Sequence, residues 1–187
     1  MTLSMFRVSS GEYTISGTIG ELPATYSAMI EHASFHDDYG VSGADGTVLV
    51  VAVERASGKW PEIIVSQRFD PGPEEGFHPG TILIPENHLL LLGAGTRLLA
   101  YDLRIPRRLW EDVTEVGFWR WKRYDDVVLM LAELELTAWD LQGKKLWSTF
   151  VEPPWDYEIQ GDHIELDVMG KKSRFAVRTG PVGAGVG

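Results

Sequence analysis

The sequence of this 187-residue chain predicts a mainly β protein: an antiparallel meander with one short helix near its N-terminus. Three observations lead to this fold class. Apolar and polar residues alternate in several short stretches, which is the period of a half-buried strand. Dipeptides typical of turns, such as Gly161-Asp162, separate these stretches. Finally, residues 100–103 (AYDL) return as residues 138–141 (AWDL), and an internal repeat of about 40 residues is typical of repeated β units.

The N-terminal part of the chain is predicted to contain one strand followed by one helix. Residues 12–19 form the strand. Residues 23–33 (PATYSAMIEHA) are predicted as a short helix, because the segment has helix formers and no interior glycine. Its larger apolar residues also fall on one helical face. The polar segment 36–40 (HDDYG) ends the helix.

A hairpin and a long loop come next. Residues 47–54 and 62–67 are apolar and β-branched, and the turn-forming sequence ASGK at 56–59 separates them. Residues 69–80 (FDPGPEEGFHPG) contain three prolines and three glycines, so this segment is predicted to be an ordered loop rather than a strand or helix.

The C-terminal part of the chain is predicted to form three repeated β units. The strands of the first are residues 81–85, 89–93 and 96–103; those of the second run from Phe118 through 127–131 and 134–140 to 145–151; those of the third are 157–160, 163–168 and 173–177. Alternation predicts one buried and one solvated face, with the acidic side chains Glu133, Glu135, Glu165 and Asp167 in water. We expect about ten to twelve strands in one domain spanning residues 1–187, with a flexible tail at 180–187.

The repeated phrase resembles the blades of PQQ-type and WD-type β-propellers. In residues 138–147 (AWDLQGKKLW) a strand ends in AWDL and turns through a Gly-Lys sequence into a strand carrying Leu-Trp; residues 100–110 match without the glycine. The resemblance covers residues 81–177 and implies blade-like antiparallel units. Propellers close with about four to eight blades, whereas this chain contains two and a half. We therefore expect the units to pack as a sandwich or half-barrel; assembly of several chains is the alternative.

Composition excludes several classes of function. The chain has 27 acidic and 17 basic residues, a formal charge of −10, which disfavours nucleic acid as a partner. Its longest apolar run, around residues 89–92, is far too short to span a membrane. Cysteine is absent, so disulfides, thiolate metal sites and cysteine nucleophiles are excluded. Because the N-terminus lacks the pattern of a signal peptide, we expect a cytoplasmic protein.

Histidines offer the only candidate metal ligands. His32 and His36 are one helical turn apart if the predicted helix continues, which is a legitimate spacing for two zinc ligands, and His78 would be a third. The glutamate of an H-E-x-x-H helix is missing. Two solvated histidines near a helix C-terminus explain the pattern better. A metal-dependent hydrolase is thus the second alternative for function, and no cofactor is predicted.

Aromatic residues give the candidate binding site. The sequence Trp119-Arg120-Trp121 places two indoles on one face of a strand, and Trp155 and Tyr157 follow two prolines; Phe77 and His78 lie in the long loop. Such a surface anchors a protein partner or stacks on a sugar. The competing interpretation is that Trp119, Trp121 and Trp155 are core residues of the β units.

These observations predict a non-enzymatic, acidic protein that binds another protein through the loops at 69–80 and 153–157. An immunity or inhibitor protein that masks a basic active site is the most specific form of this prediction. The first alternative is an aromatic-lined module for a small ligand or a carbohydrate.

Overall fold

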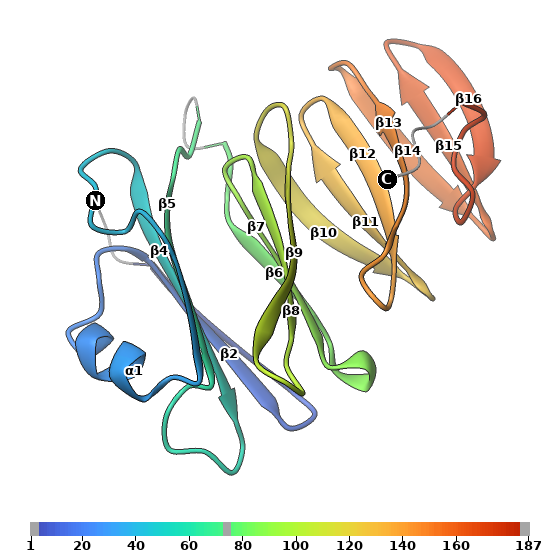
Figure 1. The fold of residues 1–187 in the computed structure, drawn as a ribbon. Helices are drawn as coiled ribbons and strands as arrows, with labels where there is room; N and C mark the ends of the chain where they lie inside the picture. The colour runs from blue at the N-terminus through green and yellow to red at the C-terminus, as the bar shows by residue number, and fades with distance from the viewer. Residues whose placement is uncertain (1–3, 73–75, 184–187) are drawn as a thin grey trace.

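The computed structural model describes residues 4–72 and 76–183. Four β-sheets follow one another along the chain and lie side by side as an open fan, each with a face against the next (Figure 1). We call them the N-terminal, second, third and C-terminal sheets. The predicted mainly β class is confirmed, and the described residues form a series of open sheets. They contain sixteen strands, more than the sequence predicted.

The N-terminal sheet has the strand order β1-β2-β4-β5-β3. Its elements are β1 (Ser4–Ser10), β2 (Tyr13–Gly20), β3 (Phe35–Tyr39), β4 (Thr47–Arg55) and β5 (Ile63–Phe69). The predicted strand at 12–19 and the hairpin of β4 and β5 are confirmed. Two strands were not predicted. Of these, β3 runs parallel to β5 at the sheet edge, where residues 36–40 were expected to be a helix terminus.

The helix is confirmed but shorter than predicted. Helix α1 (Tyr26–His32) lies on the outer face of the N-terminal sheet. Its apolar residues, among them Tyr26 and Met29, pack against Val48, Val50 and Ile64. A helix this short is stable only through such contacts, and its apolar face therefore covers one end of the fan.

The next two sheets are four-stranded antiparallel meanders with the same strand order. The second contains β6 (Gly80–Ile84), β7 (Leu89–Ala94), β8 (Arg97–Asp102) and β9 (Arg107–Val113), with a short 3-10 helix at Pro85–Asn87; the third contains β10 (Phe118–Tyr124), β11 (Val127–Ala132), β12 (Glu135–Asp140) and β13 (Lys145–Phe150). The repeated sequences AYDL and AWDL lie across the ends of β8 and β12. The predicted repeat therefore corresponds to two equivalent sheets.

The C-terminal sheet has three strands: β14 (Trp155–Gln160), β15 (His163–Val168) and β16 (Lys171–Ala176). All of its pairings are antiparallel, as predicted. In the part of the chain that the structure describes, no helix is long and apolar enough to cross a membrane.

The two tryptophans of the repeat have the same structural role. Trp110 on β9 donates its indole N–H to the Gly143 carbonyl (2.6 Å), in the turn after the third strand of the third sheet. Trp147 on β13 donates to the Val177 carbonyl (2.7 Å), which follows the third strand of the C-terminal sheet. Each Leu-Trp sequence thus joins its own sheet to the next one in the fan.

The inner strands of the two middle sheets are buried on both faces, which corrects one prediction. Alternation in residues 133–139 was expected to leave the polar set in water. Instead Leu136 and Ala138 face the C-terminal sheet, while Trp139 faces the second sheet. Glu135 accepts hydrogen bonds from Thr137 and Ser148 (2.5 and 2.6 Å), so its carboxylate is held within the stack. A sheet covered on both faces buries both sets of side chains.

Candidate functional site

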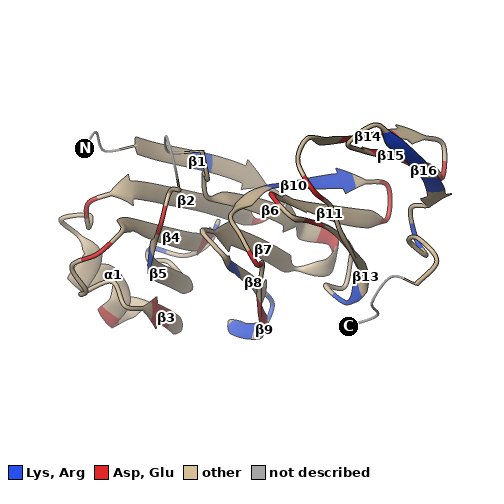
Figure 2. Cartoon of the chain, turned by 90° about the horizontal axis from the view of Figure 1, so that it is seen from above, with Lys and Arg blue, Asp and Glu red and all other residues tan. Residues whose placement is uncertain are grey.

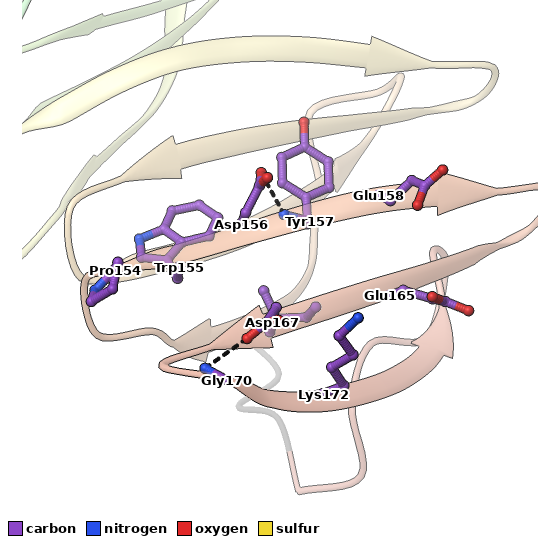
Figure 3. A pocket seen from close by; sticks show the side chains of 10 residues that line it. Pro154, Trp155, Asp156, Tyr157, Glu158, Glu165, Asp167, Gly170 and Lys172 are labelled. Atoms are coloured by element: carbon purple, nitrogen blue, oxygen red, sulfur yellow. Dashed lines mark hydrogen bonds between the residues drawn. The ribbon is translucent and has the colours of Figure 1, made fainter.

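The outer face of the C-terminal sheet carries a hollow of about 400 Å³. Its walls include four carboxylates and one lysine, Asp156, Glu158, Glu165, Asp167 and Lys172, and we call this hollow the acidic trough (Figure 3). The carboxylates come from β14 and β15, and the lysine comes from β16. This face is the free end of the fan, opposite the end covered by α1 (Figure 1).

Strand register brings the carboxylates together. Asp156 lies directly opposite Asp167, and Glu158 directly opposite Glu165. Like charges opposite each other across two strands destabilise a sheet. On the far side of β15, Lys172 lies opposite Asp167 and Arg174 lies opposite Glu165, which offsets part of this repulsion. The lining of the trough still contains four carboxylates and one lysine, beside the basic strand β16 (Figure 2).

Backbone hydrogen bonds fix two of the carboxylates. Asp156 accepts a hydrogen bond from the N–H of Tyr157 (2.8 Å), and Asp167 accepts one from the N–H of Gly170 (2.8 Å). Both bonds are drawn in Figure 3. Because one oxygen of each group is held, these two aspartates present their carboxylates in a defined position.

Two of the predicted aromatic residues support the trough from beneath. Trp155 stacks on Trp119 of the third sheet, with ring centroids 5.4 Å apart and planes inclined by 12°, and it donates its N–H to the Glu133 carbonyl (3.0 Å). The Tyr157 hydroxyl lies 3.1 Å from that of Tyr124. Burial, followed by this neighbouring hydroxyl, raises the pKa of Tyr157. These rings hold β14 against the third sheet.

The prediction that Trp119 and Trp121 share one face is wrong. The register of β10 against β11 shifts between Phe118 and Arg120, so Trp119 occupies a β-bulge. The extra residue reverses the alternation. Phe118 and Trp121 consequently both face the second sheet, where Trp121 is 9% exposed, whereas Trp119 faces the C-terminal sheet. Trp121 is a core residue.

The structure places Phe77 and His78 away from the other candidates. Phe77 borders a second hollow, of about 340 Å³, which is lined by residues of the N-terminal and second sheets and the following loop. Its ring lies against Gly72 and Gly117, where a Cβ would come within 2.2 Å of it. His78 is exposed in the same loop. The two predicted binding loops therefore contribute to different hollows.

The predicted arrangement of histidines is not present. Helix α1 ends at His32, and His36 lies on β3, so no helical turn joins them. The His36 Nε2 atom lies 3.0 Å from the Ser66 hydroxyl and 3.1 Å from the Tyr26 hydroxyl. Across residues 4–72 and 76–183, no group of three or more histidine, aspartate or glutamate side chains is placed to hold a metal ion.

Sequence reasoning missed half of the trough. It placed Glu165 and Asp167 on an outward face but did not single out Asp156 and Glu158. The signal was present, because a hairpin turning at Gly161-Asp162 puts Glu158 opposite Glu165. A turn at Gly161-Asp162 fixes the register of the hairpin, and this register places both pairs of like charges opposite each other.

Similarity to known proteins is limited to solved structures of low sequence identity. No family model and no curated protein matches the chain. It is similar to the solved structure of BamB from Moraxella catarrhalis, with 13% sequence identity and a TM-score of 0.46 over 97% of this chain and 63% of BamB. It is also similar to Sqt1 from Saccharomyces cerevisiae, with 12% identity and a TM-score of 0.44 over 73% of this chain and 42% of Sqt1. The chain thus spans less than two thirds of the length of either protein.

Proposed function

We propose that this chain is a non-enzymatic binding protein that recognises a basic surface of another protein through the acidic trough. One observation carries the proposal: the two pairs of carboxylates that lie directly opposite each other on β14 and β15. This arrangement costs stability in the free protein. Lysine or arginine side chains of a partner would relieve the repulsion and form charge-assisted hydrogen bonds with the carboxylates.

The charge of the whole chain favours the same class of partner. A net charge of −10 attracts a basic protein over distances longer than a contact, and it raises the rate of association at low salt. An inhibitor that covers a basic active site is one protein of this kind. The aromatic-lined carbohydrate module receives less support, because the rings of Trp155 and Trp119 stack on each other between two sheets.

A pair of matched variants tests the proposal. The double variant Asp156→Asn/Glu158→Gln removes two trough charges, and Glu21→Gln/Asp45→Asn removes two exposed charges from the far end of the fan. Binding of a lysine-rich peptide is measured by the NMR chemical shifts of β14 and β15. We expect the trough variant to lose this binding and the control to bind the peptide as the wild type does. We also expect the trough variant to be more resistant to urea. Its free energy of unfolding should rise by about 0.2–1 kcal/mol for each relieved pair.

Two results would contradict the proposal. One is equal peptide affinity for the trough variant and the control. The other is a set of peptide-induced shifts spread over all the acidic surfaces, since non-specific attraction by the net charge gives that pattern.

A further inference from the structure

Among the described residues, the C-terminal sheet ends one strand earlier than its two neighbours, so its edge strand is the third strand. The second and third sheets each have a fourth strand beside the third, β9 and β13. In the C-terminal sheet the third strand, β16, is the last among the described residues. The chain does not turn back along β16: Gly180 donates its N–H to the Ala176 carbonyl (3.0 Å) and lies against the ring of Trp147 on β13. Among the described residues, Gly180 occupies the outward-facing carbonyl at the Ala176 end of this edge, and no further strand pairs with the rest of β16 (Figure 1).

Backbone geometry shows which groups this edge presents. The Val177 N–H donates to the Asp162 carbonyl, directly opposite in the register (2.8 Å). Antiparallel pairing alternates along a strand. Residues 171, 173 and 175 therefore bond to β15, while the N–H and C=O groups of Lys172, Arg174 and Ala176 point away from the sheet.

The side chains of this edge are basic and exposed. Lys171, Lys172 and Arg174 are all exposed, and β16 forms a basic stripe at the end of the molecule (Figure 2). A second copy of β16 would place lysine and arginine opposite lysine and arginine, which is unfavourable. A strand with acidic residues at alternate positions would place a carboxylate beside each base instead.

We infer that the free edge of β16 binds an extended acidic segment of a partner protein as a fourth strand of the C-terminal sheet. Main-chain hydrogen bonds to Lys172 and Arg174 provide affinity, and the basic side chains select the acidic sequence. This site adjoins the acidic trough and shares Lys172 with it, but it uses the outer edge of β16, whereas the trough carboxylates belong to β14 and β15.

The test uses a fluorescent peptide in which glutamate alternates with valine or threonine, with a lysine-for-glutamate peptide as the control. We expect saturable binding of the acidic peptide only, measured by fluorescence anisotropy. Arg174→Ala removes the charge and should weaken binding about threefold, the size of an exposed ion pair. Arg174→Pro also removes the outward N–H, which is tolerated at an edge, and should weaken binding by about a further tenfold, the size of a lost hydrogen bond.

A peptide modification makes the test independent of protein folding. N-methylation of alternate residues along one edge of the peptide blocks strand pairing and keeps every charge, whereas methylation along the other edge leaves pairing intact. We expect only one of these two peptides to bind the wild-type chain. Equal binding of both, or equal affinity of Arg174→Ala and Arg174→Pro, would overturn the inference. The trough variant Asp156→Asn/Glu158→Gln should still bind the acidic peptide, so the two proposals fail separately.

Discussion

At the scale of single residues, the polar network between the N-terminal and second sheets is the most specific feature of the molecule. Tyr101, fully buried on β8, donates its hydroxyl to the Asp37 carboxylate on β3 (3.1 Å). Arg108 on β9 donates to both oxygens of the same carboxylate (3.1 and 2.9 Å). Because Asp37 is mostly shielded from water, these partners supply the hydrogen bonds that water cannot. The Tyr39 hydroxyl, also on β3, donates to Glu111 on β9 (3.2 Å). The unpredicted edge strand β3 is thus joined to the neighbouring sheet by both Asp37 and Tyr39.

This network predicts different effects for two adjacent arginines. Arg108→Ala leaves Asp37 without its cationic partner and should lower the free energy of unfolding by about 1–3 kcal/mol. Arg107→Ala is the matched control, because the Arg107 side chain is 60% exposed and lies 3.8 Å from Asp102. It should cost less than about 1 kcal/mol. Urea unfolding of the two variants measures both values, and equal losses would contradict the assigned role of Arg108.

At the scale of elements, most of the strands that the sequence predicted follow from a local pattern. The hairpin of β4 and β5 follows from apolar runs around a turn, and the equivalence of the second and third sheets follows from a repeated phrase. Strands β1 and β9 were missed although each forms a hairpin with its neighbour in sequence. Two other missed features depend on contacts with distant residues. Strand β3 (FHDDY) has no strand-like alternation and forms because β5 offers it a parallel edge. The bulge at Trp119 depends on how β10 pairs with β11.

The site was predictable to the same extent. The alternation of residues 164–168 placed Glu165 and Asp167 outward, and the hairpin turn supplied the register that faces them with Asp156 and Glu158. The burial of Trp121 against the second sheet was not predictable in this way, because one residue added at the bulge changes the sheet that its indole contacts.

Contact between the second and third sheets depends on two glycines. A Cβ at Gly93 would come within 2.6 Å of the Phe118 ring, and one at Gly80 within 3.2 Å. Gly93→Ala should therefore lower the free energy of unfolding by about 1–3 kcal/mol, the cost of overpacking a core, and Gly80→Ala by less. Combining Gly93→Ala with Phe118→Leu should cost less than the sum of the single changes. Strict additivity in urea unfolding would show that the ring and the glycine do not interact.

At the scale of the whole molecule, the fan is an array of sheets with two different ends. Helix α1 covers the apolar outer face of the N-terminal sheet, whereas the C-terminal sheet turns charged residues outward. Between these ends, tyrosine hydroxyls link neighbouring sheets. Tyr101 reaches from the second sheet to β3, and Tyr157 reaches from the C-terminal sheet to Tyr124 on β10.

These links predict that alkaline pH lowers the stability of the folded protein. Burial raises the pKa of Tyr101 well above its ordinary value of 10.0, and the neighbouring Asp37 carboxylate raises it further; burial raises the pKa of Tyr157 in the same direction. The folded state therefore keeps these phenols neutral, while the unfolded chain ionises them near pH 10.0. The stability from this difference is fully present below pH 10 and is lost as the pH rises above it. We expect the free energy of unfolding in urea to fall steeply above pH 10.

Tyr101→Phe should be less stable than the wild type at neutral pH, because the hydrogen bond to Asp37 is lost. Its alkaline slope should nevertheless be shallower, by up to about 1.4 kcal/mol per pH unit. Parallel slopes for the two proteins would mean that Tyr101 does not hold its proton in the folded state.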